Sequence, residues 1–135
     1  MANKTTMSKV MRCGQHEYGN HLRKGEEMVA AVKNSAYPDR EVIMTEMNER
    51  CKECDEGTYN ADYGFNSYAG PAYKYILQHL NLGVTGIQVW EAYDSRYHHP
   101  HRYLTWSMWG IFGVNDINHP DVYTKRTYYD VLQQL

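Results

Sequence analysis

The chain has 135 residues, which is one domain's worth of sequence and enough to bury a hydrophobic core. Its 14 basic and 16 acidic residues are interspersed and give a net charge of −2, so we expect neither a nucleic acid nor a membrane surface as a partner. No segment reaches the roughly eighteen apolar residues of a membrane span, and residues 1–9 lack the apolar region of a signal peptide.

The first half of the chain predicts two strands and one helix. Residues 9–15 are mostly apolar and favour a short strand, and the polar, glycine-containing segment 16–20 that follows favours a loop. Residues 26–33 carry apolar side chains at helical spacing, with acidic residues in the first turn and a lysine in the last. Residues 41–45 form an apolar, β-branched run typical of a buried strand, and a long polar loop is expected over 48–68.

The second half predicts a helix, a strand and a closing helix. A helix is expected over residues 71–80, starting at the proline, and residues 84–90 form the clearest strand of the sequence. An aromatic-rich loop over 91–104 leads into an apolar stretch at 105–114, and residues 125–135 favour a final helix. The alternation of strands and helices predicts an α/β fold with a parallel sheet, in a single domain over residues 1–135.

Glu46 is the main candidate for chemistry. It ends the predicted strand that includes Val42, and ligands meet parallel-sheet proteins at the carboxyl ends of their strands. The apolar strand would fix the backbone while the carboxylate projects into a cleft. The chain also has thirteen tyrosines and three tryptophans but only two phenylalanines, a balance that suits a wet interface or a carbohydrate-binding cleft.

Four segments, in order, resemble parts of the clan A retaining glycoside hydrolases, particularly family 30. Ile43-Met44-Thr45-Glu46 resembles the segment that carries the nucleophile at the end of the seventh barrel strand. His16-Glu17-Tyr18 resembles the end of the sixth strand, and Gly86-Ile87-Gln88-Val89-Trp90 resembles the eighth. Residues 125–131 resemble the start of the last barrel helix. The resemblance covers about residues 9–135 and implies a partial (β/α)8 TIM barrel, approximately its last three βα units, strands six to eight.

The resemblance also implies roles for individual residues. Glu46 would be the catalytic nucleophile in the hydrolysis of an oligosaccharide or polysaccharide with retention, a reaction for which we expect no cofactor and no metal. His16 and Tyr18 would border the sugar and hydrogen-bond the region of the nucleophile, and Trp90 would form the floor under the sugar. We therefore expect these four side chains at one face of the sheet, at the carboxyl ends of adjacent strands.

The second carboxyl group of a retaining mechanism is missing from this pattern. In the family, the acid/base is a Glu that follows an Asn at the end of the fourth strand, and residues 1–8 do not supply that strand. The Asn48-Glu49 pair follows the nucleophile segment and so falls on the wrong strand. We therefore expect a fragment that carries the nucleophile alone, is inactive by itself, and associates with the remainder of a barrel or with itself.

Two alternatives remain open at this point. One is a non-catalytic carbohydrate-binding or interaction module that keeps an aromatic cleft. The other is a zinc site formed by the CxxC pair Cys51 and Cys54 with His98, His99 and His101. We rank zinc lower because there is a single CxxC and the histidines fall in a different loop. An odd number of cysteines, three in all, favours a reduced, cytoplasmic chain, and a secreted parent enzyme is also compatible with the residues.

Overall fold

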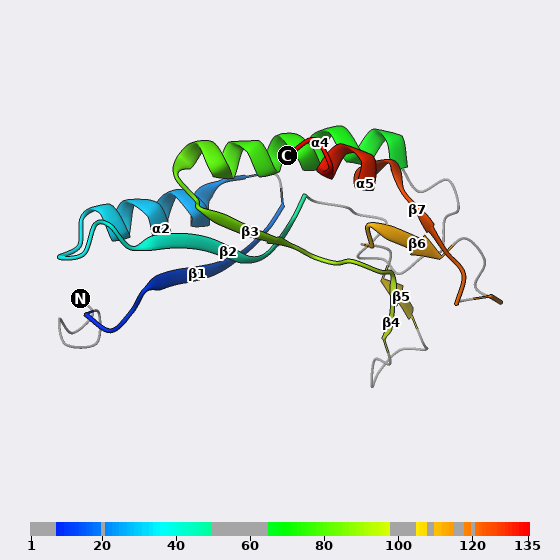
Figure 1. The fold of residues 1–135 in the computed structure, drawn as a ribbon, viewed down its shortest axis with the longest axis horizontal. Coiled ribbons are helices and arrows are strands. Elements are labelled where there is room, and N and C mark those ends of the chain that lie inside the picture. Colours follow the sequence, from blue (N-terminus) through cyan, green and yellow to red (C-terminus); the bar gives the residue numbers. More distant parts are fainter. Residues whose placement is uncertain are drawn as a thin grey trace. The chain divides into compact units, whose positions relative to one another are not determined.

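A computed structural model describes residues 8–19, 21–49, 65–97, 105–107, 110–114, 118–119 and 121–135. These residues contain three helices and seven strands, labelled in Figure 1. The chain divides into two compact units. The first comprises Met1–Asn48 and Tyr75–Val89, and the second comprises Glu49–Lys74 and Trp90–Leu135. None of the described helices is long and apolar enough to cross a membrane.

The first unit is built on a parallel sheet of three strands. Its strands are β1 (Arg12–Tyr18), β2 (Glu41–Asn48) and β3 (Gly86–Val89), and they lie in the order β1-β2-β3. Helix α2 (Arg23–Lys33) connects β1 to β2, and helix α4 (Phe65–Leu82) precedes β3. Parallel neighbours joined through helices are the pattern of βαβ units, so strand and helix alternate here as the sequence predicts.

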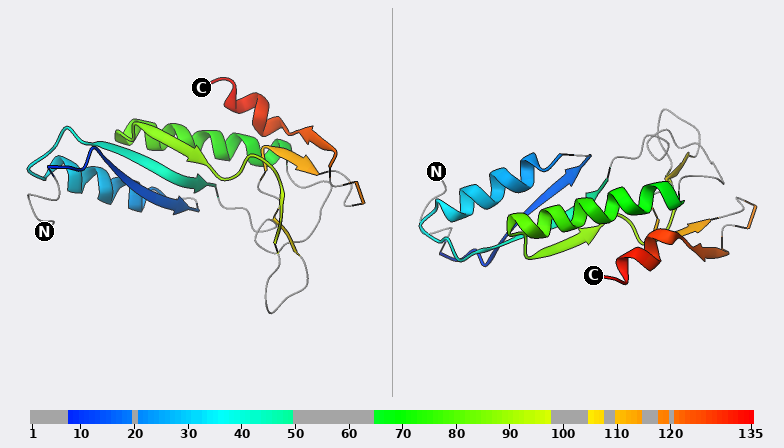
Figure 2. Two further views of the ribbon diagram at one scale, coloured as in Figure 1. Left: turned by 60° about the horizontal axis from the view of Figure 1, so that its bottom comes forward. Right: turned by 90° about the horizontal axis from the view of Figure 1, so that it is seen from above.

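Both helices lie on the same side of this sheet (Figures 1 and 2). On α2, Gly25, Val29 and Val32 are buried and are spaced by four and three residues, so they share one face of the helix. The core of the unit forms between this face, the last two turns of α4 and the covered face of the sheet. Its buried apolar side chains are Val29, Val32, Val42, Met44, Met47, Tyr75, Ile76 and Val84.

The pairing of β1 with β2 contains one irregularity. Gln15 pairs with Met44, but the next residue of β1, His16, pairs with Glu46. Thr45 is therefore an extra residue on β2, as in a β-bulge. The pairing of β2 with β3 shifts over the same part of β2, between Met44 and Met47. The bulge thus lies in the middle strand, one residue before Glu46.

The predicted boundaries of β1, β2, α2 and α4 are wrong. β1 starts at Arg12 and not at residue 9, and β2 extends to Asn48 and does not end at residue 45. β1 extends to Tyr18, so residues 16–18 belong to a strand and not to the predicted loop. Helix α2 starts at Arg23, three residues earlier than predicted, and α4 starts at Phe65, inside the predicted loop over 48–68. Pro71 therefore lies within α4 and does not start it. A proline inside a helix loses one backbone hydrogen bond. Ala69, two residues before Pro71, is buried, so the part of α4 before the proline is also packed against other residues.

The second unit contains two small antiparallel pairs and a short helix. β4 (Ser95–Tyr97) pairs with β5 (Thr105–Ser107), and β6 (Phe112–Val114) pairs with β7 (Tyr123–Lys125). The predicted loop over 91–104 is thus wrong at β4. Helix α5 (Thr127–Leu132) is shorter than the predicted closing helix, because β7 holds the first residue of that segment and the helix ends three residues before the last one.

A buried ion pair holds the second unit together. Arg126 donates from Nη1 to Asp94 Oδ1 at 2.8 Å and from Nη2 to Asp94 Oδ2 at 2.6 Å, a two-pronged geometry that suits guanidinium and carboxylate. Gly110 closes the ring of contacts, since its N–H donates to Asp94 and its carbonyl accepts from Arg126. A Cβ on Gly113 would come within 2.4 Å of Arg126 Nε, so the guanidinium lies directly against this glycine. The start of α5 is thereby tied to the segment after β3.

Candidate functional site around Glu46

Three of the four predicted site residues meet on one face of the first unit's sheet. Glu46 lies near the carboxyl end of β2, and its Oε1 accepts a hydrogen bond from the hydroxyl of Tyr18 on β1. Its Oε2 lies 2.7 Å from Nδ1 of His16, also on β1. Each oxygen of the carboxylate therefore has a partner from the neighbouring strand, and the side chain is fixed in orientation.

The bulge at Thr45 accounts for the direction of the Glu46 side chain. Side chains on a strand alternate between its two faces, and Val42 and Met44 are both buried on the helix-covered face. In a regular strand, Glu46 would follow them onto that face. The extra residue reverses the alternation, so that Glu46 shares the opposite face with His16 and Met47 returns to the core at 0% exposure.

The site is accessible to a ligand. The side chain of Glu46 is 24% exposed and that of His16 is 58% exposed. An ionised carboxylate accepts hydrogen bonds only, so Tyr18 donates its hydroxyl proton to Glu46 and His16 donates from a protonated Nδ1. The arrangement presents a fixed, partly exposed carboxylate that can act as a nucleophile or as a base.

Trp90 is the fourth predicted residue, and it belongs to the second unit. It directly follows Val89, the last residue of β3, and the Trp90–Glu91 peptide bond is cis. Val89 pairs with Met47 of β2, which is the residue after Glu46. The chain therefore leaves the sheet of the first unit after Val89. The role of Trp90 under a sugar stays a prediction.

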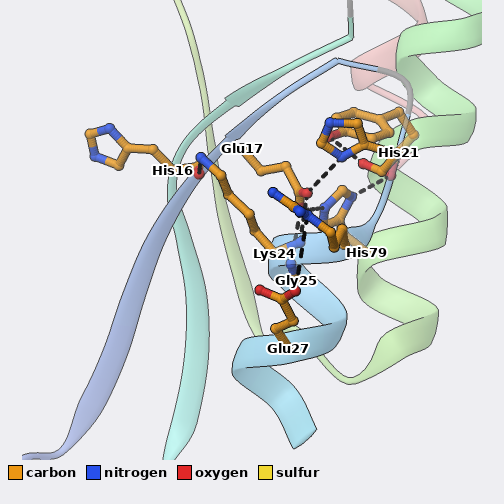
Figure 3. Close-up of polar contacts among 9 residues, drawn as sticks. His16, Glu17, His21, Lys24, Gly25, Glu27 and His79 are labelled. Atoms are coloured by element: carbon orange, nitrogen blue, oxygen red, sulfur yellow. Dashed lines mark hydrogen bonds and ion pairs between the residues drawn. The ribbon is translucent and has the colours of Figure 1, made fainter. Parts of the chain in front are cut away.

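Glu17, between His16 and Tyr18, is a residue that the sequence reasoning missed. Its side chain points to the helix-covered face and is 0% exposed. Oε1 accepts from the backbone N–H of Lys24 at 2.8 Å and lies 3.1 Å from His21 Nδ1. Oε2 accepts from the N–H of Gly25 at 2.8 Å and lies 3.0 Å from His79 Nε2. Figure 3 shows these contacts converging on the Glu17 carboxylate, with His16 directed away from them.

These contacts make Glu17 the cap of helix α2. The first N–H groups of a helix lack partners within the helix, and Leu22, the residue at the N-cap position, offers no side-chain hydrogen bond. The carboxylate of Glu17 takes the place of a cap and also meets the positive end of the helix dipole. Glu17 therefore fixes α2 against β1 from the covered face of the sheet.

His79 is the side-chain partner of this carboxylate from α4. Its Nδ1 lies 2.9 Å from the carbonyl oxygen of Tyr75 and its Nε2 lies 3.0 Å from Glu17 Oε2, so both ring nitrogens face oxygen acceptors. Burial alone raises the pKa of Glu17, but hydrogen bonds from His79 and from the two backbone N–H groups of α2 outweigh it. The pKa of Glu17 consequently lies below its usual value.

A sequence signal for Glu17 does exist. Once residues 12–18 are taken as a strand, alternation places Glu17 on the face opposite His16 and Tyr18, where a lone carboxylate needs a cation. His79 lies four residues after Tyr75 on the buried face of α4, where an imidazole also needs a partner. Placing residues 16–20 in a loop removed the alternation and concealed this pair.

The residues of the predicted zinc alternative, Cys51, Cys54, His98, His99 and His101, lie outside the described residues. Within the part of the chain that the structure describes, no group of three or more His, Cys, Asp or Glu side chains could hold a metal ion. Cys13, on β1, is a free thiol.

A scan against models of known protein families finds no match, and neither does a search of curated proteins. The glycoside hydrolase resemblance therefore depends on the four sequence segments alone.

Proposed function

We propose that this chain carries the nucleophile of a retaining glycoside hydrolase, and that Glu46 is that nucleophile. The observation that supports the proposal most is the fixed carboxylate, held through both oxygens by Tyr18 and His16 on the face of the parallel sheet opposite helix α2. A glycosidase nucleophile must be ionised, rigid and open to an anomeric carbon, and Glu46 has partners suited to an ionised carboxylate and a partly exposed side chain. The partial barrel of strands six to eight is proposed on the same resemblance.

The proposed reaction proceeds in two displacements. A carboxylate oxygen of Glu46 attacks the anomeric carbon, the glycosidic C–O bond breaks, and the leaving alcohol takes a proton from a general acid. Water, deprotonated by the same group, then attacks the anomeric carbon of the glycosyl ester and releases Glu46, so the configuration is retained. Tyr18 and His16 hold the carboxylate during both steps, and the exposed part of the His16 ring is placed to contact sugar hydroxyl groups.

We assign the general acid/base to a residue other than Glu46, Glu17 and Glu49. Glu17 is the nearest acidic residue along β1, but it is committed to α2 and His79 on the opposite face of the sheet. Glu49 follows the nucleophile on the same segment, where the family pattern places no acid/base. The proposal therefore includes a second component, the remainder of a barrel or another copy of the chain, that brings an acid to Glu46.

The first displacement can be tested without the acid. In a dinitrophenyl glycoside, the dinitrophenolate leaving group departs without needing a proton. A fluorine at C2 of the sugar slows the hydrolysis of the glycosyl ester, so the covalent enzyme accumulates. We would incubate the purified chain with a panel of such 2-fluoro glycosides and measure the intact mass and the mass of its peptides. The matched variants are Glu46→Gln and Glu41→Gln, which removes an exposed carboxylate from the same strand.

We expect one covalent sugar on the peptide that contains Glu46, unchanged in Glu41→Gln and absent in Glu46→Gln. Attachment at another residue, or no attachment by a folded chain across the panel, would overturn the proposal. Saturable binding of an oligosaccharide without any adduct would replace it by the non-catalytic binding module.

A further inference from the structure

Thr45 is held in its bulged position by two contacts to β1. Its hydroxyl donates a hydrogen bond to the carbonyl oxygen of Gln15 at 3.3 Å. Its methyl group lies over Gly14, where a Cβ on the glycine would come within 2.8 Å of Thr45 Cγ2. The Thr45 hydroxyl is thus hydrogen-bonded to the backbone of β1, and the Thr45 methyl group occupies the space left by the missing side chain of Gly14.

A methyl group at position 14 would disturb this fit. Ordinary contact begins at 3.4 Å, so Thr45 Cγ2 would have to move by about 0.6 Å. Thr45 cannot avoid the contact by a small rotation, because β-branched side chains are stiff at χ1 and its hydroxyl is bonded to Gln15. The displacement therefore passes to the backbone of the bulge, and Glu46 is the next residue along it.

We infer that Gly14 and Thr45 are positioning residues for Glu46. The glycine leaves room for the methyl group, the methyl group and hydroxyl hold the bulge, and the bulge turns the Glu46 carboxylate toward Tyr18 and His16. Neither residue contacts the reacting atoms. The consequence for catalysis rests on the proposed function, but the consequence for the geometry of Glu46 does not.

The test uses a clash and its removal. Gly14→Ala introduces the contact, and Thr45→Ser takes away Cγ2 while it keeps the hydroxyl for Gln15. The variants are Gly14→Ala, Thr45→Ser and the double variant, with Glu46→Ala as the reference for a lost carboxylate. A purely structural role for Gly14 would lower stability and leave the contact between His16 and Glu46 unchanged in the folded chain. A positioning role predicts that this contact is lost in Gly14→Ala and regained in the double variant.

Two measurements report on Glu46. The first is the tautomer of His16, read from its ring ¹⁵N shifts at a pH where histidines are neutral and assigned with His16→Gln. A contact from Nδ1 to Glu46 selects the Nδ1–H tautomer, whereas a free histidine ring prefers Nε2–H. The second is the rate of covalent labelling by the 2-fluoro glycoside described above.

We expect Gly14→Ala to shift His16 to the Nε2–H tautomer seen in Glu46→Ala and to slow labelling by ~10²-fold, the usual effect of a misplaced reacting group. The double variant should regain the Nδ1–H tautomer and label within ~3-fold of Thr45→Ser. If Gly14→Ala does not fold, the test is the double variant. It must then fold, show the Nδ1–H tautomer of His16 and be labelled by the 2-fluoro glycoside.

A folded Gly14→Ala chain with the wild-type tautomer would overturn the inference, as would a double variant that keeps the Nε2–H tautomer or fails to fold. If the tautomers follow the expected pattern but the wild-type chain is never labelled, the positioning role stands and the proposed glycosidase function fails.

Discussion

Replacing Glu17 by glutamine should lower the free energy of unfolding by about 3–5 kcal/mol, the cost of leaving a buried charge without its partner. The wild-type carboxylate has four donors around it, two at each oxygen. A glutamine offers one oxygen and one NH₂ group, so the NH₂ group would face two donors. Each buried donor left without an acceptor costs about 1–3 kcal/mol, and the buried His79 ring loses its carboxylate partner as well. These costs share one network and do not add fully, which keeps the total near the value for the ion pair.

Urea unfolding followed by far-ultraviolet circular dichroism measures this loss. Glu27→Gln is the matched control, because Glu27 lies on the exposed side of α2 with only a loose contact to Arg23 at 3.9 Å. Its loss should stay within ~0.5 kcal/mol. A Glu17→Gln chain within about 1 kcal/mol of the wild type would refute the reasoning, since in either orientation the NH₂ group faces a backbone N–H of α2, that of Lys24 or that of Gly25, which then lacks an acceptor.

Three further outcomes are expected. The pKa of Glu17 in the folded chain is lower than its ordinary value of 4.5, so the contribution of Glu17 to stability is complete above pH 4.5 and is lost as the pH falls through the folded pKa. The free energy of unfolding in urea should therefore decline between about pH 5 and 3. Glu17→Gln should flatten this decline. Asp94→Asn should lower the unfolding free energy by about 3–5 kcal/mol, measured in the same way, because it leaves the buried Arg126 without its counter-charge. Chelation by EDTA, and serine at both Cys51 and Cys54, should leave the thermal midpoint unchanged, whereas stoichiometric zinc with unfolding on chelation would show that the metal alternative is right.

Local pattern predicted the strands and helices of the first unit but not their boundaries. The apolar, β-branched run at 41–45 was sufficient for β2, because a buried parallel strand needs little more than such a run. β1 was placed three residues too early because its covered face is polar, with Gln15 and Glu17 where an ordinary strand has apolar side chains. The charge of Glu17 is neutralised by residues of α2 and α4, and no local pattern contains those partners.

The position of Glu46 was predictable from the sequence, but its direction was not. A residue at the end of a strand can point to either face, and an alternation counted from Val42 and Met44 points Glu46 into the core. The bulge that reverses this depends on Gly14, thirty-one residues before Thr45 in the chain. Register irregularities of this kind arise from contacts between strands, so hydrophobic periodicity alone does not predict them.

The segment His16–Tyr18 joins the two roles of β1. Its outer residues hold the Glu46 carboxylate on one face, and Glu17 binds the first turn of α2 on the other. Lys24, whose N–H binds Glu17, also donates from Nζ to the carbonyl oxygen of His16 at 3.3 Å, so the same turn of helix contacts the backbone of the site residue. The buried charges therefore do more than stabilise the helix. They fix strand β1, which carries His16 and Tyr18, so a shift of β1 would move both partners of Glu46 together.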